Sequence, residues 1–295
     1  MSAPEGILEA DRLQEPSDGE FTLLQTLIER EAGIHLAPAK KPLLVNRLRQ
    51  RLRVLGITSF GAYYRRIVHE TEDELVHRLD AICTYETHFF REPHHFEFLS
   101  ETLLPRWKRD AAEGRREKRV RLWSAGCSTG EEPYSLSMLL LDRLPVSEGW
   151  SHEIHATDLS TKVLAKAETA IYAADRLAEV PVPYHKAFLL RGVGAQEGRF
   201  RVSPEARGSV RFERLNLTDH RYAMPSQLDL LLCRHVLIYF RPDTRARVVA
   251  QLVQHLRPGG LLFLGHAESL QPPLPFLRSV IPTVYQYVPE NPERG

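Results

Sequence analysis

A run of small residues followed by two acids is the part of this 295-residue chain whose residue types point most directly to chemistry. Residues 124–130 read SAGCSTG, and a backbone of such small residues can approach a ligand closely. Glu131 and Glu132 follow, and Pro133 stands at the first-turn position of a predicted helix. No Gly-Lys-Ser/Thr follows the loop, so the two acids favour a cationic or hydroxyl-rich ligand over a nucleoside triphosphate.

A third acid, Asp158, ends a predicted strand at residues 153–158. Nucleotide-binding α/β folds hold a ribose by its hydroxyls at this kind of strand end. Glycine loops also occur as plain tight turns, but a loop combined with a strand-end acid favours a ligand site.

Strands and helices alternate along the second part of the chain, which predicts a doubly wound, mainly parallel sheet with the loop and Asp158 at strand ends. Apolar stretches predict buried strands at residues 120–123, 153–158, 228–233 and 261–264. Periodicity predicts helices at residues 131–140, 160–170 and 244–256. Residues 284–288 predict an antiparallel edge strand, and a glycine-rich turn at 191–198 predicts a β-hairpin in a small antiparallel insertion.

The first part of the chain has helical periodicity over residues 21–79, after a polar lead-in with the composition of a disordered segment. Residues 33–69 contain no acid. Arg49 and Arg53 lie four apart and so share a helix face, away from the leucine stripe. This face is either solvated or binds an acidic partner. RNA is a further alternative, although no aromatic residues interleave with the basic ones.

Composition argues against a general nucleic-acid binder, because the net charge is only +1. The three cysteines, Cys83, Cys127 and Cys233, form no CxxC pair and no metal spacing, as is typical of a reduced cytoplasmic protein. The sequence contains no apolar run of the ~18–20 residues that a membrane span needs, and no apolar signal segment. The charged residues 103–120 are interpreted as a solvated connector. The sequence thus predicts a cytoplasmic protein without membrane insertion.

Five motifs resemble those of the CheR family, the methyltransferases that use S-adenosylmethionine to methylate glutamates on bacterial methyl-accepting chemotaxis receptors. The motifs are TYETHFFR at residues 84–91, STGEEPYS at 128–135, ATD at 156–158, NL at 216–217 and CRHVLIYF at 233–240. The resemblance covers nearly all of residues 21–288, and together these motifs are highly specific. It implies a protein-glutamate O-methyltransferase of chemosensory adaptation that releases S-adenosylhomocysteine.

The resemblance also implies how the chain divides into domains. Residues 1–18 would form a disordered lead-in, and residues 19–82 a helical, receptor-facing N-terminal domain. Residues 83–295 would form a methyltransferase domain of the S-adenosylmethionine-dependent fold, with an inserted β-subdomain at about 180–213.

Cofactor contacts are implied at matching positions of the motifs, which are Tyr85, Thr87, Arg91, Glu131, Asp158, Asn216, Leu217, His235 and Val236. Glu131 would lie near the amino-acid part of S-adenosylmethionine, and Asp158 would bind the ribose hydroxyls. Asn216 and Leu217 would flank the adenine, and Val236 would line the pocket beside it.

Two catalytic residues are implied by the resemblance. Arg91 would border the methyl-transfer point together with Thr87, and Tyr239 would lie near the departing methyl. The acceptor glutamate has a pKa of roughly 4.3 and is ionised near neutral pH, so that no general base is required. The reaction needs in-line approach with water excluded, and Arg91 can orient a carboxylate with its fork of donors.

Tyr85 and His235 depart from the family pattern, which usually has asparagine at both positions. Tyr85 is larger and lacks the paired donor and acceptor of an amide, whereas neutral His235 still offers one of each. Both departures favour an alternative function, a catalytically impaired S-adenosylmethionine-binding or receptor-docking module. A methyltransferase acting on RNA or a small molecule is a second alternative, which the near-neutral charge opposes.

Two surfaces are predicted to bind receptors. Arg49 and Arg53 are candidates for contact with the glutamate-rich methylation helices. The loop that holds Gly192 and Gly194 resembles the loop of family members that dock on a C-terminal receptor pentapeptide, which predicts tethering by β-augmentation. Nothing in the sequence demands more than a monomer.

Three histidines could suggest a metal site, namely His88, His94 and His95. In the sequence no acid or thiolate completes a ligand set for them. The expectation is therefore that the protein binds no metal.

Overall fold

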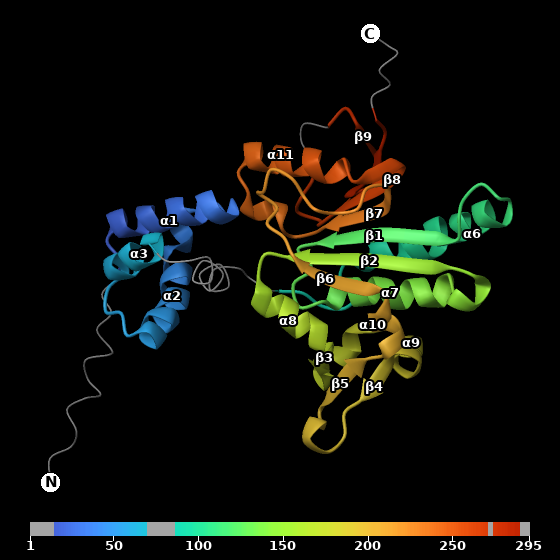
Figure 1. Cartoon of the computed structure of the whole chain (residues 1–295), viewed down its shortest axis with the longest axis horizontal. Helices are drawn as coiled ribbons and strands as arrows, with labels where there is room; N and C mark the ends of the chain where they lie inside the picture. Colours follow the sequence, from blue (N-terminus) through green and yellow to red (C-terminus); the bar gives the residue numbers. More distant parts are fainter. Residues whose placement is uncertain (1–14, 70–85, 271–273, 290–295) are drawn as a thin grey trace. The chain divides into compact units, whose positions relative to one another are not determined.

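The computed structural model describes residues 15–69, 86–270 and 274–289 (Figure 1). The chain divides into two compact units. The first comprises Met1–Thr84 and Tyr239–Thr244, and the second comprises Tyr85–Ile238 and Arg245–Gly295.

The first unit is helical, and its helices begin and end where the sequence supplies caps. It contains α1 (Asp18–Ala32), the short 3-10 helix η2 (Pro38–Lys40), α2 (Lys41–Leu55) and α3 (Phe60–His69). Ser17 and Glu20 form a capping box at the start of α1. Residues 17 and 18 of the predicted lead-in therefore belong to a helix terminus, and residues 1–14 lie outside the described part. Gly56 ends α2 with a left-handed φ of 66°, as its position predicts.

The second unit is built on a seven-stranded sheet in the order β6-β2-β1-β7-β8-β10-β9 (Figure 1). Its strands are β1 (Arg119–Ala125), β2 (Ser151–Asp158), β6 (Val210–Arg214), β7 (Leu228–Cys233), β8 (Leu256–Leu264), β9 (Leu277–Ile281) and β10 (Val284–Tyr287). The first five strands in the order are mutually parallel, and β10 pairs antiparallel with both β8 and β9. All six residues of β7 are buried, as expected for a central strand with both faces covered. The predicted doubly wound, mainly parallel sheet is confirmed.

Helices connect and cover these strands. The α-helices are α5 (Pro93–Glu97), α6 (Leu104–Ala112), α7 (Glu131–Arg143), α8 (Thr161–Thr169), α9 (Val182–Phe188), α10 (Pro204–Gly208) and α11 (Pro242–Val253). A π-helical segment, η3 (Phe98–Leu103), joins α5 to α6, and short 3-10 helices are η4 (Val146–Glu148), η5 (Ala174–Glu179), η6 (Gly194–Gln196) and η7 (Leu237–Tyr239). Trp107 of α6 and Leu140 of α7 share one core with Leu122, Ile154 and Leu230 of the strands. This core fixes the strands whose ends carry the predicted site.

The strand at residues 284–287 is not the edge strand that the sequence predicted. β10 lies between β8 and β9, so β9 forms the edge. Three consecutive residues of β9 are exposed, and a pattern without alternation gives no strand signal in the sequence.

A second, three-stranded antiparallel sheet is inserted between α8 and β6 (Figure 1). Its order is β3 (Ile171–Ala173), β5 (Arg199–Val202), β4 (Leu189–Arg191), and β4 and β5 form the predicted hairpin. The insertion differs from the predicted bounds of about 180–213, because β3 precedes residue 180 and β6 pairs with β2 in the main sheet. Val202 N donates to Ala170 O at 3.0 Å, so the inserted segment is hydrogen-bonded at its two ends.

Candidate functional site

Residues that follow four neighbouring parallel strands form the centre of the candidate site. Glu131 follows β1, Asp158 ends β2, Asn216 follows β6 and Val236 follows β7. Because these strands are parallel, their carboxyl ends meet at one edge of the sheet, where open α/β folds bind ligands. The strand order therefore brings these predicted residues to one edge.

The Asp158 carboxylate fixes the loop that the sequence singles out. Its Oδ2 accepts from Ser128 N at 2.9 Å and its Oδ1 accepts from Ser160 N at 3.0 Å. Gly126 has a φ of 80°, and a Cβ at that position would lie 2.3 Å from Val236 Cγ2. Glycine thus lets the loop pack closely against Val236.

Glu131 is 1% exposed, and both of its carboxylate oxygens are hydrogen-bonded. Oε2 accepts from Thr129 Oγ1 at 2.6 Å, and Oε1 accepts from Arg176 Nη2 at 2.9 Å. The same Nη2 donates to Thr87 O at 2.6 Å. Arg176 thus ties the loop after β1 to the segment that precedes Arg91. The sequence analysis missed Arg176, because it lies outside every motif.

Arg91 is held in a turn with unusual backbone geometry. Its neighbours Phe90 and Glu92 have positive φ angles of 51° and 61°, a strained conformation that is enriched at functional sites. Phe90 N donates to Ser135 Oγ at 2.9 Å, and Arg91 O accepts from Arg234 Nη1 at 2.6 Å. The Arg91 side chain donates to Glu86 O at 2.6 Å. Tyr85, which precedes this segment, lies outside the described residues.

A buried ion pair connects two of the three eight-residue motifs, those at residues 128–135 and 233–240. Arg234 Nε donates to Glu132 Oε2 at 2.6 Å, and the exposed fractions of the two side chains are 2% and 11%. Glu132 Oε1 accepts from Ser124 Oγ at 2.6 Å. The sequence analysis did not assign a role to either partner, although both stand inside motifs that it quoted.

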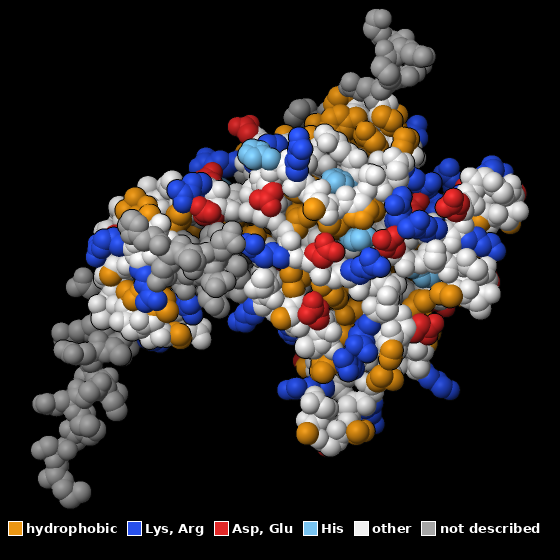
Figure 2. Space-filling model, viewed as in Figure 1, with side chains coloured by type: hydrophobic (Ala, Val, Ile, Leu, Met, Phe, Trp, Pro, Cys, Tyr) orange, Lys and Arg blue, Asp and Glu red, His pale blue; other side chains and the backbone are white. Residues whose placement is uncertain are grey.

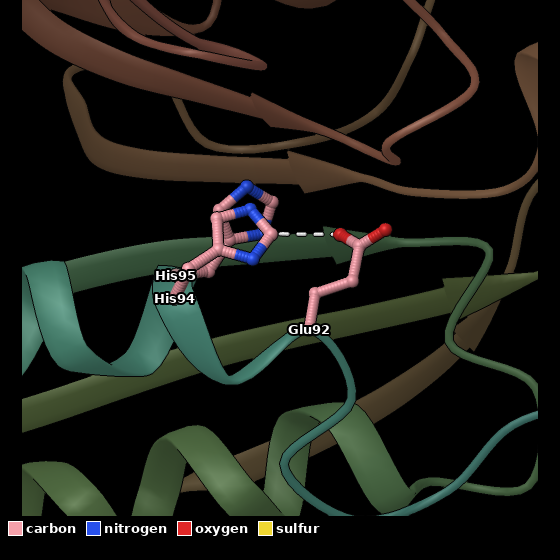
Figure 3. Close-up of side chains that lie close together, drawn as sticks. All are labelled: Glu92, His94 and His95. Carbon is pink, nitrogen blue, oxygen red and sulfur yellow. Dashed lines mark ion pairs between the residues drawn. The ribbon is translucent and has the colours of Figure 1, made fainter.

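Glu92 lies beside His94 and His95, and its Oε2 is 3.3 Å from His95 Nδ1 (Figure 3). The argument that no acid completes a ligand set with these histidines is therefore wrong, because Glu92, His94 and His95 present ligand atoms close together. Arg234 Nη1 lies 3.3 Å from both Glu92 Oε2 and His95 Nδ1, so this group of side chains already holds a cation. The predicted absence of a bound metal stays a prediction.

His235 adopts a positive φ of 62°, which Glu268 stabilises. The fully buried Glu268 carboxylate accepts from His235 N at 2.7 Å and from Gly265 N at 2.7 Å. His235 Nε2 lies 3.1 Å from Glu92 Oε1, and His266 Nδ1 lies 2.8 Å from the same oxygen. Although burial opposes ionisation of Glu92, its close contacts with these two histidines hold the pKa of its carboxyl well below the ordinary value.

The remaining predicted cofactor residues lie close to strand ends, and the catalytic candidate Tyr239 belongs to the first unit. Asn216 Oδ1 accepts from Thr218 N at 3.0 Å, and Leu217 is 8% exposed. The Tyr239 ring lies 5.5 Å from Lys40 Nζ. The roles of all three predicted residues stay predictions.

The predicted receptor-binding arginines lie on α2. Arg53 is exposed, and Arg49 Nη2 donates to Glu15 Oε1 at 2.5 Å. The positive charge of α2 is thus partly neutralised by Glu15, which precedes the acid-free stretch of residues 33–69.

The predicted docking loop has backbone geometry that depends on glycine. A Cβ at Gly192 would lie 2.0 Å from Gln196 O, and Gly194 has a φ of 58°. Gly192 N donates to Arg199 O at 2.9 Å and extends the hairpin pairing by one bond.

The buried His95 gives an expected pH dependence of stability. Burial and the Arg234 guanidinium lower the pKa of His95 from 6.5 to about 3, while Nε2 lies 2.9 Å from Thr283 Oγ1. In the unfolded chain the ring takes up a proton near pH 6.5, whereas in the folded protein it stays neutral until about pH 3. The contribution of His95 to the free energy of unfolding is complete above pH 6.5 and is lost as the pH falls towards 3, by about 1.4 kcal/mol per pH unit at most.

Denaturant unfolding of the protein and of His95→Gln at pH 7.5, 6.5 and 5.5 measures this effect. This range lies above the ordinary pKa of Glu92, so the carboxyl adds no slope. We expect the difference in unfolding free energy between the two proteins to shrink as the pH falls. A constant difference would mean that His95 is not held neutral.

Comparisons with known proteins agree with this arrangement. A family model described as CheR methyltransferase, SAM binding domain matches residues 85–282, and one described as CheR methyltransferase, all-alpha domain matches residues 19–83. The chain is similar to chemotaxis protein methyltransferase 2 of Pseudomonas aeruginosa, 37% identical over 271 residues, covering 90% of this chain and 92% of that protein. It is also 39% identical over 255 residues to the chemotaxis protein methyltransferase of Escherichia coli K12, covering 86% and 85%. Within the described ranges no helix is long and apolar enough to cross a membrane.

Proposed function

The chain belongs to the CheR family, and we propose that it transfers the methyl group of S-adenosylmethionine to glutamate side chains of methyl-accepting chemotaxis receptors. The two relatives named above are chemotaxis protein methyltransferases, and the match covers 92% and 85% of their lengths. The observation that carries the proposal is the meeting of Glu131, Asp158, Asn216 and Val236 at one edge of the sheet. The reaction would take place in the cytoplasm, where thiols such as the buried Cys127 stay reduced.

The residues at this edge fit S-adenosylmethionine. Its sulfonium and ammonium groups are cationic, and acids stand next to the loop at Glu131 and Asp158. Asp158 is at the strand end that suits ribose hydroxyls, and Leu217 offers apolar surface for adenine. When bound, the cofactor supplies an electrophilic methyl group.

The protein has three tasks in this reaction. Arg91 orients the acceptor carboxylate, which is already ionised at neutral pH and needs no base. The Arg234 bond to Arg91 O holds the turn in place. The packing of the loop against Val236 shapes the wall of the cofactor pocket beside the adenine.

A methylation assay with receptor-containing membranes and methyl-labelled S-adenosylmethionine tests the proposal. We expect label in the receptor band, and alkali should release it as methanol because glutamate methyl esters are base-labile. Label that resists alkali, or label in RNA, would contradict the substrate assignment.

Asp158 is expected to contribute to cofactor affinity. The Asp158→Asn side chain keeps the size and one acceptor that support the loop but loses charge, and it should weaken S-adenosylhomocysteine binding by about 1–3 kcal/mol. Calorimetric titration measures this loss. A ligand without the ribose 2′- and 3′-hydroxyls serves as the control, because the variant should no longer distinguish it from S-adenosylhomocysteine. Equal affinity of the protein and the variant would remove Asp158 from the ribose site.

Receptor binding is proposed at two places, the α2 face with Arg49 and Arg53 and the edge of the small sheet. β4 pairs only with β5 among the described residues, so its outer edge can accept a further strand. Leu190 of β4 is 50% exposed. These features support docking of an extended receptor tail peptide by β-augmentation.

Reversal of charge on α2 should separate methylation from tethering. Arg49→Glu with Arg53→Glu places acids opposite the acidic methylation helices, and receptor methylation should fall by about tenfold or more. Binding of a fluorescent receptor tail pentapeptide should stay unchanged, because the hairpin is untouched. As a matched control, Gly192→Val should lose the peptide, since its side chain would meet Gln196 O. Normal methylation in the double variant would leave α2 a solvated helix.

A receptor-docking module with impaired catalysis is the alternative function. His235 favours it, because its ring lies against Glu92 in place of the usual asparagine amide. Titration with S-adenosylhomocysteine decides between the two functions. Micromolar binding supports the enzyme, and restoration of binding only in His235→Asn with Tyr85→Asn supports the impaired module.

A further inference from the structure

A hollow of about 440 Å³ lies at the opposite end of the main sheet from the candidate site. Arg115 and Arg116 in its wall precede β1, and Arg257 stands near the start of β8. The site residues described above follow the carboxyl ends of the strands, whereas this hollow is formed at their amino ends. It is therefore separate from the methyl-transfer site.

Arginines dominate the wall of the hollow. Five of them line it, Arg106, Arg115, Arg116, Arg257 and Arg278, together with one carboxylate, Asp110. A neighbouring hollow of about 220 Å³ shares three of these arginines and adds two more, Arg119 and Arg121, together with the carboxylates of Glu117 and Asp229. Figure 2 shows blue side chains gathering around the end of α6 and the start of β1. Positive charge concentrated in a concave surface attracts small anions.

Nearby acids neutralise this charge only in part. Asp110 pairs with Arg106 and Arg115, and Glu113 also pairs with Arg115. Asp229 pairs with Arg116 at 3.0 Å and with Arg257 at 2.9 Å, so one carboxylate serves two guanidinium groups. Arg278 donates at 2.6 Å to the amide oxygen of Gln286 and has no ion pair within the described ranges. Burial lowers the pKa of Arg116, and the Arg257 charge acts in the same direction, whereas Asp229 opposes the shift.

The buried guanidinium of Arg116 is preorganised. Its side chain is 7% exposed and stacks 4.1 Å from the Trp107 ring centroid, so the interpretation of residues 103–120 as a solvated connector is wrong here. Its Nη2 donates to Asp229 at 3.0 Å and to Arg119 O at 2.8 Å. Arg116 Nη1 and Arg257 Nε are buried and have no hydrogen-bond partner among the described residues. Both nitrogens are closed to solvent, so an anion in the hollow would meet the exposed guanidinium groups of Arg115 and Arg278 instead.

The wall is not purely basic. Phe98, Leu261 and Val280 also line the hollow, next to the arginines. Guanidinium groups bind phosphate oxygens in pairs, and the apolar residues suit an organic group attached to the phosphate. The volume lies within the range of roughly 300–1,000 Å³ of small-molecule sites. We propose that this hollow is a second ligand site of the methyltransferase unit, for an organic phosphate of nucleotide size.

Calorimetric titration of the full-length protein with ATP as the probe tests this site. The protein is first saturated with S-adenosylhomocysteine, so that ATP cannot enter the cofactor site. We expect saturable one-to-one binding that Arg278→Gln weakens by about tenfold, since one charge-assisted hydrogen bond is lost. Arg278 lies at an exposed strand edge, so the variant should fold. Arg109→Gln removes an exposed arginine of α6 that does not line the hollow, and it should bind ATP normally.

Three results would overturn the proposal. These are no saturable binding of ATP, equal binding by Arg278→Gln and Arg109→Gln, and competition between ATP and S-adenosylhomocysteine. Titrations with adenosine and with inorganic pyrophosphate test the organic part and the phosphate part of the ligand one at a time. Neither compound should bind as tightly as ATP. Equally tight pyrophosphate binding would restrict the site to inorganic anions and contradict the organic part. Failure to bind S-adenosylhomocysteine would contradict only the proposed function, and ATP would then be titrated alone.

Discussion

Replacement of Arg91 by alanine is expected to lower methyl transfer by about a thousandfold. Arg91 stands in a turn whose flanking residues both have positive φ, and its backbone oxygen accepts from the buried Arg234. A side chain presented on so constrained a turn loses little entropy when it orients a carboxylate. The side chain itself donates only to Glu86 O among the described residues, so its removal leaves the fold intact.

Initial rates with receptor membranes, together with thermal unfolding, measure this effect. Arg91→Lys keeps the charge but loses the paired donors, and we expect an intermediate rate. Arg109→Ala on the exposed face of α6 serves as the control and should transfer methyl groups normally. Near-normal turnover of Arg91→Ala would remove Arg91 from the mechanism.

Replacement of Arg234 by methionine is expected to cost about 3–5 kcal/mol of unfolding free energy. The substitution preserves much of the volume but leaves the Glu132 and Glu92 carboxylates without the cation that they share. The cost arises from uncompensated buried charge and not from lost packing. Addition of Glu132→Gln should therefore recover part of the loss, because it removes one of the two charges.

Denaturant unfolding of the single and double variants measures this coupling. Arg109→Met is the matched control and should change stability by no more than about 0.5 kcal/mol. A double variant that is less stable than Arg234→Met would contradict the account by buried charge.

Local patterns in the sequence were sufficient to predict five of the seven strands of the main sheet, all except β6 and β9, and several helix ends. The apolar run at Leu228–Cys233 could only be a buried strand, and Gly56 ends a helix where its position indicates. β3 contains only three residues, Ile171–Ala173, which is too short for a period to be recognised. Its place is set by pairing with β5, nearly thirty residues later in the chain.

The candidate site was predicted through its motifs, but the partners that hold those motifs together were not. Arg234 and Glu132 are separated by 102 residues, and their contact arises only when β7 is placed beside β1. Arg176 lies in no motif, and its bonds to Glu131 and Thr87 depend on the path of the chain into the small sheet. Contacts of this kind are set by topology, which local patterns do not contain.

The hydrogen bond between Val202 N and Ala170 O also has an evolutionary consequence. This bond joins the two ends of the inserted segment, so the segment can change in length and sequence with little effect on the main sheet. The entropic cost of closing a loop depends only weakly on its length. The three-stranded sheet can therefore be exchanged between relatives as a cassette, provided that Tyr172 and Phe200 still pack against Phe89. Recombination at this junction would replace the proposed docking edge in a single step and leave the parallel strands in register.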